Sequence, residues 1–267
     1  MEYGAAHDVR VLQLTTEVPM SATPFYSRIR QIVPWLVALS ALALAACGGG
    51  AGGPSGGAVG PPVPAPQLAV GDHWQYRIVD NLRRGAVSTL DLEVSSISNG
   101  VATLRMIYTN PQGATTERNE EINAQGWLVV GTLKDEMTRR YPTPIELYDF
   151  PLTGGTTWRQ TVDTISPETG IRAQILVYGN VQGQSQVTVP AGTYNSVYLY
   201  RILQLDDEQF WRTRTTRRDS VWYAPETKAP AKEMREAQYI ENGGMDVAPI
   251  RTEYTVRELV SFRPGRG

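Results

Sequence analysis

The sequence predicts an all-β domain made mainly of antiparallel strands, and three observations lead to this fold class. Apolar and polar residues alternate with a period of two over residues 73–78, 90–95 and 103–108, which indicates strands with one buried face. Turn-forming residues follow these stretches at Asn99-Gly100 and Pro111-Gln112-Gly113. No spacing typical of a βαβ unit occurs, so a parallel α/β fold is not expected.

The first element along the chain is an export signal. An apolar run of 13 residues extends from Ile32 to Leu44, whereas a membrane-spanning helix takes about 20 residues. Arg28 and Arg30 precede this run, and it leads into Leu-Ala-Ala-Cys, with the cysteine at position 47. This motif resembles the lipobox of bacterial lipoproteins, in which the cysteine thiol becomes a thioether to diacylglycerol. We therefore predict that Cys47 carries a lipid anchor, with palmitate among its acyl chains.

Residues 1–46 are interpreted as an N-terminal extension followed by the signal peptide. The first 19 residues contain Glu2, Asp8 and Glu17, although the start of a signal peptide is expected to be positively charged. If translation starts at Met20, the only charged residues before the apolar run are Arg28 and Arg30. We therefore expect the true start at residue 20.

Residues 47–66 form the second element, a linker that begins with the lipidated cysteine. Glycine and proline make up 13 of the 19 residues from 48 to 66, so the segment cannot bury a core of its own. A G-x-S-x-G pattern at residues 53–57 has neither the strand nor the helix that a nucleophile elbow requires. The segment is therefore predicted to be a tether without catalytic chemistry.

Residues 67–267 are predicted to form a single β domain of 201 residues, enough for a sizeable core. The segment 231–238 consists of good helix formers, but it leads into Tyr239-Ile240 and the turn residues Asn242-Gly243-Gly244, as a hairpin strand would. We predict a strand there. The many aromatic residues of the domain can fill a core or line an apolar cavity, and the sequence leaves both open.

Three motifs carry a resemblance to a known group of proteins. They are Gly71-Asp72-His73-Trp74-Gln75-Tyr76, Val187-Thr188-Val189-Pro190-Ala191-Gly192-Thr193-Tyr194 and Trp222-Tyr223-Ala224-Pro225. They resemble those of a loose group of uncharacterised bacterial envelope proteins, many of them lipoproteins. The resemblance implies a strongly curved antiparallel sheet, a half-barrel or open barrel with few or no helices, and it brings no catalytic residue. That group has glycine after W-Y-A-P, where this chain has Glu226, so a longer turn is expected.

The two prolines of these motifs have a physical role that does not depend on the resemblance. Proline cannot donate a hydrogen bond to a β-ladder, so Pro190 and Pro225 are predicted to end strands. We interpret the motifs as corners of the fold in preference to a functional site.

Few residues are candidates for chemistry. One cysteine and two histidines exclude an internal disulfide and multi-cysteine metal centres, and a net charge of −2 gives no nucleic-acid footprint. His73 is the one histidine of the mature chain and has no nucleophile motif to partner it, so a surface histidine is expected. The acids of residues 206–208 are expected to lie in a hairpin turn. The sequence therefore predicts no catalytic residue, cofactor or metal.

The densest basic stretch consists of Arg212, Arg214, Arg217 and Arg218. Guanidinium groups suit lipid phosphate or an anionic glycan. The interpretation we favour is a solvated cationic face paired with nearby acids.

These observations predict a lipid-anchored protein of the cell envelope. It is bound to the membrane through an N-terminal diacylglyceryl-cysteine. Gly48 after that cysteine, in place of an aspartate, resembles the outer-membrane sorting pattern of organisms with two membranes, so we expect the outer membrane with the β domain facing the periplasm. The domain is expected to bind an apolar ligand or an envelope protein without catalysis. The alternatives are an assembly scaffold or a hydrolase that uses carboxylates such as Asp91, Glu93 or Asp206.

Overall fold

The computed structural model describes residues 60–133, 138–165, 170–205, 211–242 and 248–266. These described residues all belong to one compact unit. The proposed start at Met20, the signal peptide, Cys47 and most of the linker lie outside the described residues, as does Asp206.

The prediction of an all-β fold is confirmed. The described residues contain twelve strands and one single-turn 3₁₀ helix, and none of their helices is long and apolar enough to cross a membrane. The elements are β1 (His73–Asp80), β2 (Ala86–Ser98), β3 (Val101–Thr109), β4 (Thr115–Asn123), β5 (Leu128–Gly131), β6 (Arg139–Ile145), β7 (Thr157–Ile165), β8 (Arg172–Val189), β9 (Gly192–Leu205), β10 (Thr215–Ala224), η1 (Pro225–Thr227), β11 (Ala229–Tyr239) and β12 (Ile250–Arg263).

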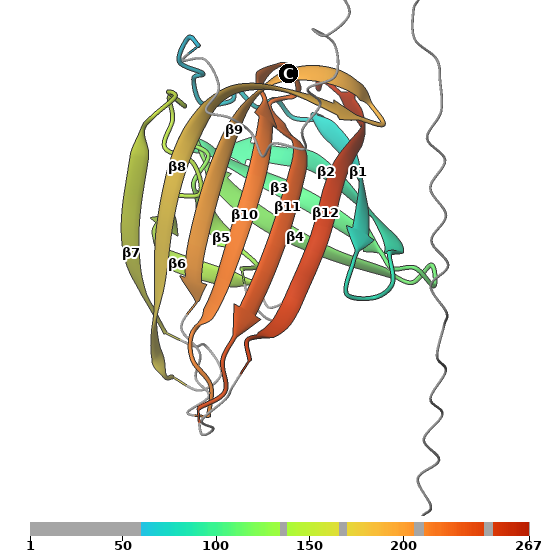
Figure 1. Ribbon diagram of the computed structural model, residues 1–267. Helices are drawn as coiled ribbons and strands as arrows, with labels where there is room; N and C mark the ends of the chain where they lie inside the picture. The colour runs from blue at the N-terminus through green and yellow to red at the C-terminus, as the bar shows by residue number, and fades with distance from the viewer. Residues whose placement is uncertain (1–59, 134–137, 166–169, 206–210, 243–247, 267) are drawn as a thin grey trace, which may run out of the picture. The chain divides into compact units, whose positions relative to one another are not determined.

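All twelve strands belong to one antiparallel sheet, in the order β6-β5-β4-β3-β2-β1-β12-β11-β10-β9-β8-β7. Each strand therefore pairs with its neighbour in sequence, except that β1 pairs with β12 and the sheet ends at β6 and β7. Figure 1 shows that the sheet curls round, so that β1–β5 lie behind β8–β12. The strongly curved open barrel expected from the resemblance is the fold observed.

Side chains bridge the seam between the two end strands. The Gln160 Nε2 on β7 donates to the Pro144 carbonyl at 2.9 Å, and its Oε1 accepts from the Glu146 amide at 2.8 Å. The Trp158 Nε1 donates to the Glu146 carbonyl at 3.0 Å. These bonds satisfy backbone groups that would otherwise stand at an open sheet edge, so the barrel is nearly closed.

Local sequence explains two of the connections. Asn99 and Gly100 both adopt positive φ angles, 51° and 75°, which is the conformation of a type I′ hairpin between β2 and β3. The segment 231–238 is part of strand β11, as predicted, because it is paired on both sides, by β10 and by β12. Tertiary pairing thus overrides the helix propensity of these residues.

The end of the predicted linker packs against the β domain. Val63 is 8% exposed and exchanges two backbone hydrogen bonds with Leu152, at 3.0 and 2.8 Å. Leu152, which is 1% exposed, belongs to the connection between β6 and β7. The last residues of segment 47–66 therefore help to cover one side of the core.

Candidate functional site

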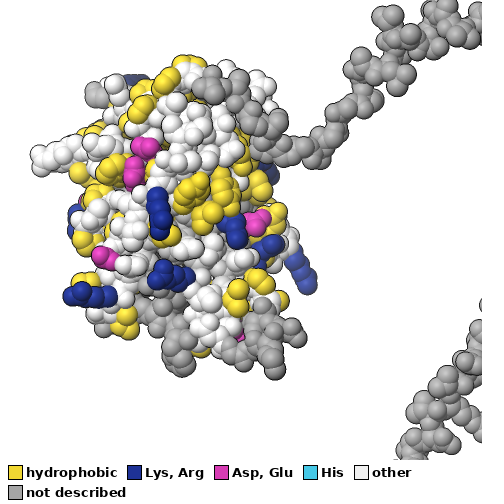
Figure 2. Space-filling view, turned by 60° about the vertical axis from the view of Figure 1, so that its left-hand side comes forward, with side chains coloured by type: hydrophobic (Ala, Val, Ile, Leu, Met, Phe, Trp, Pro, Cys, Tyr) yellow, Lys and Arg dark blue, Asp and Glu magenta, His cyan; other side chains and the backbone are white. Residues whose placement is uncertain are grey.

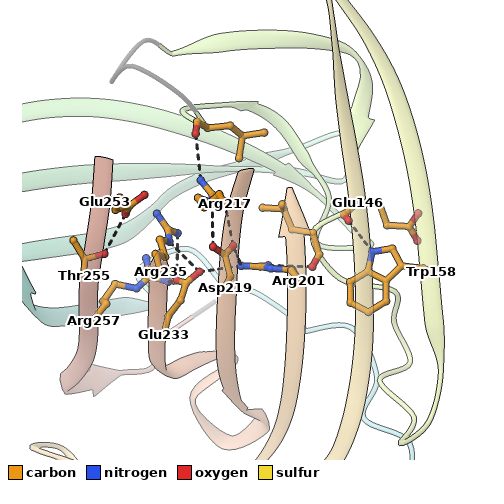
Figure 3. A network of polar contacts seen from close by, with 12 residues as sticks. Glu146, Trp158, Arg201, Arg217, Asp219, Glu233, Arg235, Glu253, Thr255 and Arg257 are labelled. Atoms are coloured by element: carbon orange, nitrogen blue, oxygen red, sulfur yellow. Dashed lines mark hydrogen bonds and ion pairs between the residues drawn. The ribbon is translucent and has the colours of Figure 1, made fainter. Parts of the chain in front are cut away.

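The inward face of β9–β12 carries a row of charged side chains. Period-two alternation buries Leu199, Arg201 and Leu203 on the same face of β9, so an arginine occupies a core position. The strand register places Arg201 opposite Asp219, and Asp219 opposite Arg235. Opposite charges therefore alternate across three neighbouring strands, as Figure 3 shows.

Two carboxylates are shared among these arginines. The Arg201 Nη2 lies 3.0 Å from Asp219 Oδ2 and 2.9 Å from Glu233 Oε1. The Arg235 Nε donates to Glu233 Oε1 at 3.1 Å, and Arg257 contacts Glu233 Oε2. Arg201, Asp219 and Glu233 are at most 1% exposed, whereas the side chains of Arg235 and Arg257 are 31% and 20% exposed, so the ionic network is buried at its centre and partly exposed at these two arginines.

The connections between strands take part in the same network. The Arg217 guanidinium binds Asp219 and donates through Nη1 to the Leu133 carbonyl at 3.2 Å. The Arg201 Nη1 donates to the Leu147 carbonyl at 3.0 Å, and its guanidinium lies 4.8 Å from the centre of the Tyr148 ring. The arginines therefore hold two connections, after β5 and after β6, onto β9 and β10.

The surplus of arginines determines the charge state of the network. Burial by itself raises the pKa of Glu233, but the charges of Arg235, Arg257 and Arg201 outweigh it and hold that pKa well below its usual range. Glu233 is therefore ionised at neutral pH, and its carboxylate is shared among three guanidinium groups. A shared carboxylate of low pKa is unsuited to general acid catalysis.

Four tyrosines lie close to this network or to the apolar core beside it. Burial raises the pKa of Tyr76, Tyr148 and Tyr223, and burial raises the pKa of Tyr141 to about 12. In an unfolded chain all four would ionise near pH 10. The folded protein thus keeps these hydroxyls protonated near pH 10, where those of an unfolded chain would ionise.

We expect stability to fall as the pH rises above about 10, because the unfolded chain then loses tyrosine protons that the folded chain retains. The stabilisation from these raised pKa values is complete below pH 10 and is lost as the pH passes the folded-state values. Tyrosinate absorbance, recorded at increasing pH with and without denaturant, measures both states. Ionisation of every tyrosine near pH 10 in the folded protein would contradict the burial of these four hydroxyls.

Apolar side chains form three clusters in the core beside the network. One cluster includes Trp74, Tyr76 and Leu259, and a second includes Leu152, Trp158 and Tyr223. A cavity near one end of the barrel holds about 20 Å³, enough for about one water molecule. It is lined by Leu133, Arg139, Tyr141, Thr164, Ala173, Gln174, Ile175 and Leu205. The aromatic residues that the sequence left open as core or cavity lining thus include several that pack in a filled core.

Residues of the three sequence motifs pack in one apolar cluster, at the corner where β1 pairs with the last strand, β12. Asp72 is fully buried and accepts hydrogen bonds from the amides of Ala69 and Gly265, both at 2.8 Å, and from Lys228 Nζ at 2.8 Å. The Trp74 Nε1 donates to the Thr227 carbonyl at 2.7 Å. The G-x-x-W-x-Y motif therefore holds the turn that follows W-Y-A-P, which supports reading the motifs as corners of the fold.

That turn is short. The 3₁₀ turn of Pro225–Thr227 follows β10 directly, Lys228 adopts a left-handed conformation with φ of 58°, and β11 starts at Ala229. Lys228 thus takes the conformation that glycine usually provides, and the expectation of a turn longer than in the resembling group stays a prediction.

The candidates named from the sequence do not come together at a cleft within the described residues. Leu90 and Val94 are buried, so Asp91 and Glu93 lie on the outer face of β2. His73 Nε2 lies 3.6 Å from Asp91 Oδ1, at the surface. These contacts form a surface polar cluster and do not build a hydrolase site.

Two arginines of the basic stretch at residues 212–218 lie on opposite faces of β10. Arg217 is 3% exposed and belongs to the buried network, whereas Arg218 lies on the outer face of β10. The expectation of a solvated cationic face is therefore wrong for Arg217, because an inward strand position places its guanidinium beside Asp219. Sequence reasoning also missed Arg201, Asp219 and Glu233, although their period-two spacing from buried leucine, valine and alanine was a usable signal.

Comparisons with known proteins give distant structural likeness alone. No protein-family model and no curated protein matches the chain. The chain is similar to a Parabacteroides distasonis protein inferred to be a lipoprotein, with 13% identity, a TM-score of 0.47, and coverage of 76% of this chain and 100% of that one. A Bacteroides fragilis protein inferred to be exported, with a YmcC-like fold, has 12% identity, a TM-score of 0.43, and the same coverage.

The hypothetical lipoprotein YmcC of Escherichia coli has 9% identity and a TM-score of 0.37, over 73% of this chain and 85% of that one. Likeness of this degree does not assign the chain to a family.

Proposed function

We propose that the protein is a lipid-anchored component of the bacterial cell envelope, and that its β domain acts through its outer surface on an envelope protein. The observation that carries the second half of this proposal is the buried network around Glu233. A domain whose interior is filled with paired charges and packed aromatics offers its outer surface, and not its interior, to other molecules.

An apolar ligand inside the barrel is disfavoured by the same network. To enter between β9–β12 and the opposite strands, it would have to displace Arg201, Asp219 and Glu233, which are at most 1% exposed, and it would meet their charges beside the apolar side chains. Separating a buried ion from its partner costs several kcal/mol. Binding of an envelope protein, or an assembly role, is therefore better supported than binding of an apolar ligand.

The location rests on the sequence. The Leu-Ala-Ala-Cys motif supplies the anchoring cysteine at position 47, and Gly48 follows it, which favours the outer membrane with the domain on the periplasmic side. The glycine- and proline-rich segment after Cys47 holds the domain away from the bilayer, at ~3 Å per residue where it is extended. This function requires no catalytic residue, cofactor or metal.

Cys47→Ser tests the anchor. We expect the variant to leave the membrane fraction almost completely, because no thioether to diacylglycerol can form, while thermal unfolding of the β domain stays unchanged. Cell fractionation with immunoblotting measures the first effect and circular dichroism the second. Ser55→Ala, in the same linker, is the matched control and should stay with the membrane.

The released Cys47→Ser protein also tests the role of the interior. Solvent extraction followed by mass spectrometry should find no stoichiometric lipid. Membrane retention of Cys47→Ser would refute the anchor, and one bound lipid per chain would refute the proposal that the domain works through its outer surface.

A further inference from the structure

The outer face of β9–β12 carries three rows of side chains that run across the strands. The strand registers set a centre row of Tyr200, Ser220, Met234 and Val256. A second row lies two residues along each strand on one side of the centre row, and a third row lies two residues along on the other side. All three rows are on the same face of the sheet. All these side chains are partly exposed, and together we call them the β9–β12 face.

The second and third rows differ in chemistry. The second row consists of Tyr198, Trp222, Lys232 and Glu258. The third row consists of Ile202, Arg218, Glu236 and Tyr254. The face thus combines aromatic, aliphatic and arginine side chains, the types that are enriched in protein interfaces.

Apolar area continues beyond this face. Tyr178 on β8 stands opposite Ile202 and is 38% exposed. Figure 2 looks onto the side of the barrel where β7 and β8 lie, and it shows apolar side chains gathered in the middle, with arginine and lysine side chains beside them. An apolar area with charged neighbours is the pattern of a protein-binding surface.

The two outer rows complement each other. A two-fold axis along the centre row would place a second copy face to face with the first and bring the second row of each copy onto the third row of the other. Lys232 would then lie opposite Glu236, and Trp222 opposite Arg218, giving an ion pair and a cation–π contact. Tyr198 would meet Ile202, and the Tyr254 hydroxyl could donate to Glu258.

We infer that a second copy of this chain docks on the β9–β12 face and forms a two-fold symmetric dimer. All four exchanged pairs are favourable, and each occurs twice in such an isologous contact. The two sheets would pack with aligned strands about 10 Å apart, as in a β-sandwich. The inference deepens the proposed function, on which it rests for the use of the outer surface, by naming the partner as the chain itself.

The geometry also sets the strength of the dimer. Twelve residues on a convex face are fewer than the roughly 20–30 per side of a standard interface, so the dimer should be weak in dilute solution. Attachment of both copies to one membrane raises their effective concentration. The test therefore uses the full chain in its membrane.

Ser220→Cys reports the contact. Ser220 lies on the centre row, so its two copies would face each other across the axis, within reach of a short bis-maleimide cross-linker. The sequence has a single cysteine, Cys47, whose thiol the lipid is proposed to block. We expect a cross-linked dimer from Ser220→Cys, and none from the parent chain or from Thr103→Cys on the distant strand β3.

Charge reversal tests the proposed pairing in the Ser220→Cys background. Lys232→Glu places acids opposite acids, and Glu236→Lys places bases opposite bases, so each variant alone should give about tenfold less cross-linked dimer. Co-expression of the two variants should restore it, since one copy then presents two acids and the other two bases. A general loss of folding would not be rescued in this way.

Three results would overturn the dimer: no cross-link through Ser220→Cys, a cross-link insensitive to both reversals, or no recovery on co-expression. If Cys47 carried no lipid, the parent chain would itself cross-link through the free Cys47 thiol and would leave the membrane fraction, whereas failure of the dimer alone leaves the protein in the membrane with no cross-link through Ser220→Cys. Failure of the anchor, seen by fractionation, is therefore distinguished from failure of the dimer.

Discussion

Glu233→Gln is expected to lower the free energy of unfolding by about 3–5 kcal/mol. The substitution keeps the size of the side chain and removes its charge. Arg201, Arg235 and Arg257 would then share a neutral amide in place of a carboxylate, inside a core where Glu233 is 1% exposed. An uncompensated buried charge costs far more than the loss of one hydrogen bond, so the whole barrel should become easier to unfold.

Urea denaturation followed by tryptophan fluorescence measures this effect, since Trp74 and Trp158 are buried in the core. Glu117→Gln is the matched control. Glu117 makes a two-point contact with Arg105, at 2.7 and 3.0 Å, but its side chain is 53% exposed, so water can replace the lost charge and little change is expected. Equal losses in the two variants would show that burial does not govern the strength of the network.

A network of this kind does not have to maximise stability. Well-packed apolar residues in place of a buried ionic group are often as stable or more so, whereas removal of one partner is costly. The alternating charges on β9, β10 and β11 instead fix how these strands align, because a shift of the register by two residues would place Arg201 opposite Arg217 or Val221 in place of Asp219. We interpret the network as a device that selects one register of a long, uniform sheet.

The sequence reveals the strands more readily than the network, and the reason is physical. Period-two alternation is a local signal, and it predicts strands correctly at residues 73–78, 90–95 and 103–108. Asn99-Gly100 likewise determines its own hairpin. An arginine such as Arg201 breaks the apolar pattern of its strand, and only the partners supplied by other strands explain it.

Pairing between distant segments also lies beyond local patterns. The contact of β1 with β12 joins Trp74 to Phe262, and the seam at β6 and β7 depends on Gln160 reaching Pro144. The curvature of the sheet follows from these contacts, so it was predicted from the resemblance and not from periodicity. Cys47 is the reverse case, since its prediction depends on sequence alone and it lies outside the described residues.

Asp72→Ala is expected to cost about 2–4 kcal/mol of stability. The fully buried carboxylate accepts from the Ala69 amide, the Gly265 amide and Lys228. Alanine would leave the two amides without their acceptor, and it would remove the side-chain link between the start of β1 and Gly265, although the backbone pairing of β1 with β12 would remain. Lys228, with a side chain 26% exposed, can turn to water, so Lys228→Met should cost less than Asp72→Ala.

The pH dependence of this loss separates the charge of Asp72 from its size. Burial raises the pKa of Asp72, but hydrogen bonds from Lys228 and from the Gly265 and Ala69 amides outweigh it, so the pKa lies below its usual range. The stabilisation is therefore complete above about pH 4, the unfolded value, and is lost as the pH falls through the lower folded value. The difference in urea midpoint between wild type and Asp72→Ala should shrink in acid, whereas Asp91→Ala, with a surface carboxylate, should change stability little at any pH. If Asp72→Ala were as mild as Asp91→Ala, the contacts of Asp72 with Lys228 and Gly265 would not hold the barrel together, and a functional role of the G-x-x-W-x-Y and W-Y-A-P motifs would gain support.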